Sequence, residues 1–342
     1  MNWQERILSL NEINQYIGDK DESSISASVE ALIAHQKANW QQLKEGYEAF
    51  SQIETRNVNI DGSNIVVQHN PRRVRSTAAA VDKDSIAARP CFLCSENLPE
   101  EERGIFYDEE YVILCNPFPV LDKHLVIAHK QHIEQKIEGR IEELLALAFD
   151  LGDEYFVLYN GPECGASAPD HLHFQALSRA VLPIEETLKA GEPPSEADCG
   201  VCESMERGNF ELFTVTDAGR SVIVFRGANK FELVPWVYQI IASLSKATFK
   251  PEPMLNIVAY VDSGVYTVLL FPRARHRPAC FFAEGAERLT ISPGAVDMAG
   301  IVVVPEPEHY KKISAEQIEM IFSEVSLNSD FVDEIVGQVC EA

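Results

Sequence analysis

Two histidines and a glutamine alternate with apolar residues in the segment HLHFQAL, residues 171–177. Residues two apart in a β-strand point to the same face of a sheet, so His171, His173 and Gln175 would form one polar row. A neutral imidazole is a competent nucleophile toward phosphorus and can carry a covalent intermediate. A neighbouring amide can donate a hydrogen bond to a phosphoryl oxygen. The row therefore predicts a site of nucleotidyl transfer, although a hydrogen-bonded structural pair of histidines is the alternative.

Anion-binding residues accompany this row. The preceding loop, NGPECGASAPD, offers backbone N–H groups around Gly165 and the hydroxyl of Ser167 to a phosphate. Arginines occur in two clusters, HNPRRVR and PRARHR, and planar guanidinium groups suit phosphate. From these clusters we expect the substrate to be bound by Arg72, Arg73, Arg273 and Arg275.

Cysteines with metal-ligand spacing form a second constellation. Cys91 and Cys94 are separated by two residues, a spacing that can hold one tetrahedral zinc ion. A closed site needs two more ligands. The spacing alone leaves open whether these are His132, His171 or the second pair, Cys199 and Cys202. The two pairs also admit a redox or metal-sensing function.

Composition limits the class of partner. The chain has 342 residues and a formal net charge of −24, which argues against nucleic acid or an anionic membrane surface as partners. The first twenty residues carry charges throughout and do not resemble a signal peptide. No apolar run approaches the ~20 residues that span a bilayer. We therefore expect a cytoplasmic protein with reduced cysteines.

The elements that must position these residues repeat along the chain. An amphipathic helix over 27–52 and short strands over 55–59 and 64–68 come first, followed by a long basic loop over 69–84. The order strand–strand–helix–strand–strand then occurs twice. The first copy covers 111–115, 124–129, the helix 136–152, 155–159 and 171–177. The second covers 211–215, 221–227, the helix 230–247, 256–261 and 265–271, with the helix broken or kinked near Pro235.

This repetition predicts an α+β protein built from two similar halves by internal duplication, each an antiparallel sheet with packed helices. A segment rich in proline and acidic residues marks the boundary. We expect a catalytic half over 1–190, a linker over 191–205 and a degenerate second half over 206–342.

The segment DHLHFQ resembles the H-x-H-x-Q signature of the transferase and phosphorylase branch of the histidine-triad (HIT) superfamily. That branch includes galactose-1-phosphate uridylyltransferases, diadenosine tetraphosphate phosphorylases and GDP-hexose phosphorylases. The segment NPFPVLDKHLVIAHKQH is similar to the region upstream of the signature, and residues 292–335 look like the C-terminal stretch of the GDP-hexose phosphorylases. The resemblance spans roughly residues 68–335.

The resemblance implies roles for matching residues. His173 would be the nucleophile, Gln175 would stabilise the nucleotidylated state, and Asn160 and Ser167 would hold phosphates. It also selects one ligand set for a structural zinc ion, which would anchor the row beside the nucleophile. That set consists of Cys91, Cys94, His132 and His171.

The implied activity is that of a nucleotidyltransferase of the phosphorylase type, acting on a GDP-hexose with phosphate as acceptor. Asp170, where the uridylyltransferases have proline before the first histidine, favours the phosphorylases. Diadenosine polyphosphate phosphorolysis and hexose-1-phosphate uridylyl transfer are the enzymatic alternatives, and a zinc-stabilised nucleotide-binding protein is the non-enzymatic one. The expected partners are a nucleotide sugar and phosphate, with a homodimer left open.

Overall fold

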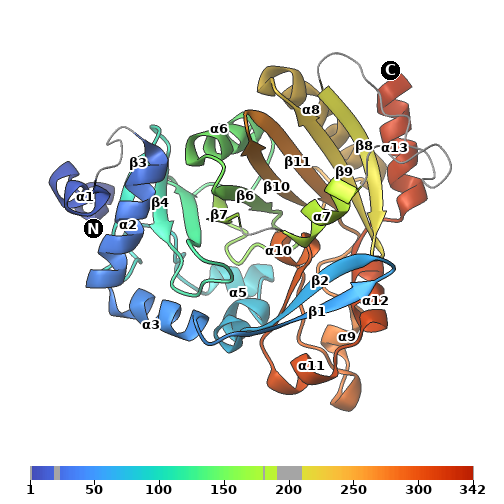
Figure 1. Ribbon diagram of the computed structural model, residues 1–342, viewed down its shortest axis with the longest axis horizontal. Helices are drawn as coiled ribbons and strands as arrows, with labels where there is room; N and C mark the ends of the chain where they lie inside the picture. Colours follow the sequence, from blue (N-terminus) through green and yellow to red (C-terminus); the bar gives the residue numbers. More distant parts are fainter. Residues whose placement is uncertain (1, 19–23, 180–181, 191–209, 342) are drawn as a thin grey trace.

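A nine-stranded antiparallel sheet forms the centre of the protein (Figure 1). The structure is a computed structural model that describes residues 2–18, 24–179, 182–190 and 210–341. The strands of this sheet lie in the order β3-β4-β5-β7-β6-β10-β11-β9-β8. The predicted linker, 191–205, together with Cys199 and Cys202, lies outside the described residues.

The sheet consists of two copies of one hairpin–helix–hairpin unit, as the sequence predicts. Their strand orders mirror each other, and β6 pairs with β10 where the copies meet. The two halves therefore share one continuous sheet, which the sequence did not indicate. The first copy comprises β4 (Tyr111–Cys115), β5 (Leu125–His129), α6 (Ile141–Leu151), β6 (Tyr155–Asn160) and β7 (His173–Ser178), with β3 (Gly104–Tyr107) at its edge. The second comprises β8 (Phe210–Asp217), β9 (Arg220–Gly227), α8 (Lys230–Thr248), β10 (Leu255–Asp262) and β11 (Val265–Pro272).

Both faces of the sheet are covered, so its strands read as nearly continuous apolar runs. In β6, Tyr155 and Val157 pack into one core while Phe156 and Leu158 pack into the other. The first core contains side chains of α2 (Ile25–Asn39), α6, α8 and α13 (Ser329–Glu341). The second contains side chains of α7 (Pro183–Ala190), α10 (Ala295–Met298) and α12 (Ala315–Val325). The chemistry lies on this second face.

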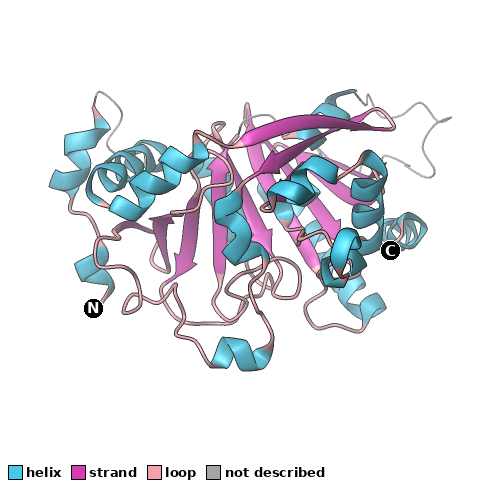
Figure 2. Cartoon of the chain, turned by 90° about the horizontal axis from the view of Figure 1, so that it is seen from below, coloured by secondary structure: helices cyan, strands magenta, loops and turns pink. Residues whose placement is uncertain are grey.

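A small three-stranded sheet lies over the second face of the large sheet rather than within it (Figure 2). The hairpin of β1 (Glu54–Ile60) and β2 (Ser63–His69) matches the predicted strands. The third strand, β12 (Ile301–Val304), comes from the C-terminal half and pairs with β2 in parallel. This pairing brings the segment 292–304 over the first half of the molecule.

Two helix predictions need correction. The helix expected over 27–52 is divided into α2 and α3 (Gln41–Phe50), because Trp40 adopts an extended backbone between them and is buried. The helix α8 is not broken at Pro235, which lies within its second turn.

The remaining elements are short or terminal. Part of the predicted long loop is helical, in η2, α4 and α5. No helix of the described residues is long and apolar enough to cross a membrane. The elements not yet given are η1 (Trp3–Arg6), α1 (Leu10–Ile17), η2 (Pro71–Arg73), α4 (Val74–Thr77), α5 (Lys83–Ala87), α9 (Ala279–Phe282), η3 (Gly285–Glu287) and α11 (Pro307–Lys312).

Candidate active site

A cavity of about 780 Å³ lies on the second face of the sheet and is lined by residues of both halves. Its floor is formed by β4, β5, β6 and β7, and residues 72–81 and 292–297 line it as well. Most of the residues predicted to bind substrate or act in catalysis line it. They are Arg72, Arg73, Asn160, Gly165, Ser167, His173 and Gln175.

The His173 side chain is held in one tautomer. Its Nδ1 lies 2.9 Å from the backbone carbonyl oxygen of His171, so Nδ1 carries the hydrogen and donates it. The Nε2 lone pair is then available to the cavity. Burial lowers the pKa of His173 to about 4, so the ring is neutral at physiological pH. A neutral ring with an available Nε2 is what nucleophilic attack requires.

The predicted polar row is only partly correct. The strand β7 begins at His173, and His171 lies before it. His173 and Gln175 line the cavity, whereas the ring of His171 lies against the two cysteines, with Nδ1 3.2 Å from Cys91 Sγ. At this end of β7 the side chain of Gln135 bridges the backbones of β7 and β6. Its amide accepts from the His173 N–H at 2.8 Å and donates to the carbonyl oxygens of His173 and Asn160.

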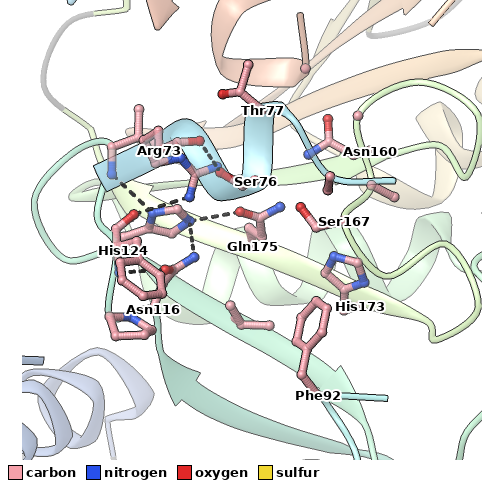
Figure 3. Close-up of a pocket in the computed structure, with 18 of the residues that line it drawn as sticks. Arg73, Ser76, Thr77, Phe92, Asn116, His124, Asn160, Ser167, His173 and Gln175 are labelled. Atoms are coloured by element: carbon pink, nitrogen blue, oxygen red, sulfur yellow. Dashed lines mark hydrogen bonds between the residues drawn. The ribbon is translucent and has the colours of Figure 1, made fainter. Parts of the chain in front are cut away.

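Gln175 is oriented by His124, a residue that the sequence analysis did not single out. His124 Nδ1 accepts from the Val120 N–H at 3.3 Å, so its hydrogen is on Nε2 and is donated to Gln175 Oε1 at 2.8 Å. The amide NH₂ of Gln175 is therefore directed away from His124, and Figure 3 shows this side chain lying between His124 and Ser167. The signal was available, since His124 directly precedes β5, which pairs with the strand that carries Gln175.

The side-chain amide of Asn160 is also held in one orientation by hydrogen bonds to its oxygen. Its Oδ1 accepts from Asn256 Nδ2 and from the Ala295 N–H, both at 2.8 Å. Its NH₂ group is left for the cavity that the residue lines (Figure 3). The donors come from the second half of the chain, so the second half helps to form the site.

The arginine predictions divide into two outcomes. Arg72 and Arg73 line the cavity, whereas Arg273 and Arg275 do not. Arg273 is buried and donates to the side chain of Asn256 and to several backbone carbonyls, so it supports the cavity from behind. Arg275 is largely exposed and forms an ion pair with Glu324 at 2.6 Å. The neighbouring Arg277 lines the cavity instead.

The loop before β7 needs a glycine at Gly165. Its φ is +113°, and a Cβ there would lie 2.9 Å from the Cα of Gly294 and 3.1 Å from Asn160 Oδ1. Ser167 follows, and its carbonyl oxygen accepts from Arg89 Nη2 at 3.0 Å. Arg89 also lines the cavity and was not predicted. The loop thus brings the backbone of both halves close together beside Asn160.

The cluster of Cys91, Cys94, His132 and His171 is formed as the resemblance implied. Their donor atoms all lie within 4.8 Å of one another, and Cys94 Sγ is 3.3 Å from His132 Nδ1. Tetrahedral zinc with bonds of about 2.0–2.3 Å places neighbouring donors about 3.3–3.8 Å apart, so the set fits the ion. His171 Nε2 lies 2.7 Å from the carbonyl oxygen of His129, which leaves Nδ1 unprotonated for a metal.

Asp170 links this cluster to the cavity. Its Oδ2 lies 3.5 Å from His132 Nε2, and its Oδ1 lies 3.6 Å from Arg89 Nη2. A carboxylate on the far nitrogen of a ligating histidine orients the ring and raises its basicity. The residue that departs from the uridylyltransferase pattern is therefore placed behind a candidate metal ligand.

Comparison with known proteins agrees with this geometry. The family model named "Domain of unknown function (DUF4922)" matches residues 32–178, and the model named "GDPGP1-like, C-terminal domain" matches residues 197–342. An uncharacterized HIT-like protein of Chlamydia trachomatis is 31% identical over 90 residues, which cover 23% of this chain and 81% of that protein. A HIT-like protein of Chlamydia muridarum is 29% identical over 90 residues, covering 23% of this chain and 71% of that protein. The chain belongs to the HIT-like family.

The fold has a solved counterpart. The yeast Ap4A phosphorylase Apa2, in its complex with Ap4A, aligns with a TM-score of 0.57 and 13% identity, over 84% of this chain and 97% of that one. The predicted α+β fold with two HIT-like halves is therefore confirmed. The predicted boundaries at 190 and 206 stay predictions.

Proposed function

We propose that the protein is a nucleotidyltransferase of the phosphorylase type that works through a covalent nucleotide on His173. The observation that carries this proposal is the neutral His173 ring, whose Nδ1–H is engaged by its own backbone and whose Nε2 is available to the cavity. Family membership and the likeness in fold to a phosphorylase support it. A histidine adduct holds the nucleotidyl group on the enzyme, so that a second acceptor such as phosphate can take it.

The reaction has two displacements. In the first, the Nε2 lone pair of His173 attacks the α-phosphorus of a nucleoside diphosphate hexose. The bond from the α-phosphorus to the bridging oxygen breaks, and hexose 1-phosphate leaves with the electron pair. In the second, an oxygen of inorganic phosphate attacks the same phosphorus, the P–N bond breaks, and the nucleoside diphosphate leaves. No proton donor is needed for either leaving group at neutral pH.

Charge stabilisation would come from groups that are already oriented. The NH₂ of Gln175 and the NH₂ of Asn160 are held toward the cavity by partners on their oxygen atoms. Among the described residues nothing pairs with the guanidinium of Arg72, which leaves it for a phosphate. Phosphoryl transfer depends mainly on positioning and electrostatics, and preorganised donors supply both.

The substrate favoured by the sequence is a GDP-hexose with phosphate as acceptor. The resemblance of HLHFQA and of residues 292–335 to GDP-hexose phosphorylases supports this choice, as does the GDPGP1-like model over the second half. Diadenosine polyphosphate phosphorolysis is the second candidate, because the yeast protein of similar fold is an Ap4A phosphorylase. Hexose-1-phosphate uridylyl transfer is a third, favoured by the Cys2His2 cluster. The cytoplasmic location and the homodimer stay predictions.

The four-residue cluster would hold a structural zinc ion through Cys91, Cys94, His132 and His171. With all four positions taken by protein ligands, the ion would tie together the segment before β3, the loop after β5 and the residues before β7, and would supply no catalytic water. The chain's own residues would then perform the chemistry.

A product assay tests the proposal. The full chain is incubated with phosphate and, separately, with GDP-, ADP- and UDP-hexoses and diadenosine tetraphosphate, and the products are separated by ion exchange. Phosphate-dependent formation of a nucleoside diphosphate and hexose 1-phosphate is expected, with the GDP-hexose reacting fastest. Binding of nucleotides without any phosphate-dependent product would instead identify a zinc-stabilised binding protein.

A further inference from the structure

Glu102 is a buried carboxyl group that lines the cavity at a distance from the nucleophile. Its side chain is only 7% exposed, and no described residue forms a hydrogen bond or ion pair with its carboxyl oxygens. The nearby Arg6 does not provide one, because its guanidinium donates to the backbone carbonyls of residues 95, 98, 99 and 100. The carboxyl group is therefore left for the cavity that it lines, where a bound molecule can supply the hydrogen-bond donors that the described residues do not.

The chain holds Glu102 firmly in this place. Gln36 of α2 accepts from the Arg103 N–H at 2.8 Å and donates to the Glu101 carbonyl at 3.4 Å. One buried amide thus fixes the backbone on both sides of Glu102. Trp40, the residue that follows α2, also lines the cavity. Leu93 and Leu114 line the cavity too, so its wall includes apolar side chains against which a flat ring can pack.

The register of the sheet relates Glu102 to the reacting residues. Gly104, Leu114, Val126 and Gln175 lie side by side across β3, β4, β5 and β7. Glu102 precedes Gly104, the first residue of β3, by two residues and lines the same cavity as Leu114, Val126 and Gln175. Three strand spacings of about 4.8 Å separate the ends of this row, which is about 14 Å. The strand that follows Glu102 thus lies about 14 Å from the strand that carries Gln175, a separation that a nucleoside 5′-phosphate can span.

We infer that Glu102 selects the base of the nucleotide by accepting two hydrogen bonds from the Watson–Crick edge of guanine. Guanine presents N1–H and the 2-amino group as adjacent donors, and a carboxylate offers two oxygens in the matching geometry. Adenine presents an acceptor at N1, and uracil presents one donor between two carbonyls, so either base would place an acceptor against a carboxylate oxygen. A site built for such a pair rejects bases that leave its buried polar group unpaired.

The burial of the Glu102 carboxyl group is consistent with a role in base selection. Burial raises the pKa of Glu102 to about 8 in the free protein, and two N–H donors would favour its charged form when guanine binds. The inference rests on the proposed nucleotidyl site only for the placement of the phosphate near His173. Base selection can therefore be measured without the transfer reaction.

The test compares binding of GMP, AMP, UMP and xanthosine monophosphate to the full chain by calorimetry. Wild type is expected to bind GMP about 100-fold more tightly than AMP or UMP. Glu102→Gln is expected to lose GMP affinity by about 100-fold and to gain affinity for the xanthine nucleotide. Its amide offers one acceptor and one donor, which match N1–H and the 2-carbonyl of xanthine. That gain would also show that the variant folds.

Glu101→Gln is the matched control, because Glu101 is the exposed neighbour of Glu102. It is expected to bind all four nucleotides as wild type does. Undiminished preference for GMP in Glu102→Gln, or wild-type preference for AMP or UMP, would overturn the inference. If GMP selectivity depends on Glu102 but no nucleotide is ever transferred, the proposed function fails and the inference stands. Transfer with a base choice independent of Glu102 would overturn the inference alone.

Discussion

The imidazole of His124 and the amide of Gln175 are joined by a hydrogen bond of 2.8 Å between Nε2 and Oε1. His124 Nδ1 accepts from the Val120 N–H, which favours a hydrogen on Nε2 that is donated to Gln175, and Asn116 Nδ2 lies 3.3 Å from the same Nε2. Two neighbouring strands thereby determine which end of the Gln175 amide is presented to the cavity. In the proposed reaction that end is the donor for the transferring phosphoryl group.

Removing the amide donor of Gln175 is expected to slow nucleotide transfer more than removing His124, which orients that amide. Gln175→Ala should lower the rate of nucleotide transfer to His173 by about 10²–10³-fold, the usual effect of losing one oriented donor. His124→Phe should lower it by about tenfold, because the amide can then rotate. His124→Gln, which keeps an N–H donor, should recover part of that loss. Single-turnover rates at saturating substrate check this order, and equal rates for wild type and Gln175→Ala would contradict it.

Arginine substitutions should separate the residues that line the cavity from those that do not. Arg72→Gln is expected to raise the KM for the nucleotide sugar by about 10–100-fold, since a hydrogen bond to a charged group contributes about 1.5–3 kcal/mol. Arg275→Gln should leave it unchanged, because Arg275 pairs with Glu324 outside the cavity. Steady-state kinetics of the two variants measure this difference. A larger effect at Arg275 would show that the phosphates bind elsewhere.

Local patterns in the sequence predicted the parts of the site that local geometry determines. Period-two alternation pointed to His173 and Gln175, which line the cavity, and the two-residue spacing of Cys91 and Cys94 pointed to half of the Cys2His2 cluster. Glu102 was missed, because what distinguishes it is a buried carboxyl group with no partner among the described residues, and that is visible only in the folded protein. Arg273 was assigned to the substrate because composition alone does not distinguish a phosphate ligand from a buried arginine that donates to carbonyls.

The sequence patterns also did not predict which strands pair when they lie far apart in the chain. The continuity of the two halves depends on β6 pairing with β10, and both strands are almost entirely buried. Asn160 and Asn256 form a polar pair in this register, but they lie far apart in the sequence and no local pattern relates them. The strand β12 is short, and its parallel partner β2 lies more than two hundred residues earlier. These contacts carry the second half over the cavity and bring Ala295 to Asn160.

Stability should fall in acid through His124. Burial lowers the pKa of His124 in the folded protein to about 3, below its ordinary value of 6.5. The His124 side chain therefore binds a proton below about pH 6.5 in the unfolded chain but only below about pH 3 in the folded chain. This contribution to stability is present above pH 6.5 and is lost as the pH falls, by about 2 kcal/mol at pH 5.

Urea unfolding of wild type and His124→Gln at pH 7 and pH 5 measures this effect. Protonation of other histidines also lowers the stability of the protein in acid. The informative quantity is therefore the difference between wild type and His124→Gln. The variant should lose about 2 kcal/mol less than wild type between the two pH values. An identical pH dependence in both would mean that His124 is solvated or charged in the folded state.

Metal analysis tests the cluster. The purified protein is expected to contain one zinc ion per chain, and Cys94→Ser should lose the ion and melt at a lower temperature. Cys199→Ser is the control and should keep the ion. Zinc content by atomic emission together with thermal unfolding checks both statements. Loss of zinc only in the Cys199 variant would show that the metal is bound by the second cysteine pair.

The most direct test of the central claim is the intact mass of the protein after incubation with GDP-hexose in the absence of phosphate. We predict a covalent GMP adduct on wild type that is stable in base, labile in acid and discharged as GDP when phosphate is added. His173→Ala should form no adduct while still binding GMP. Adduct formation by His173→Ala at the wild-type rate would contradict the assignment of His173 as the nucleophile. Phosphate-dependent turnover of wild type without any adduct would contradict the covalent mechanism.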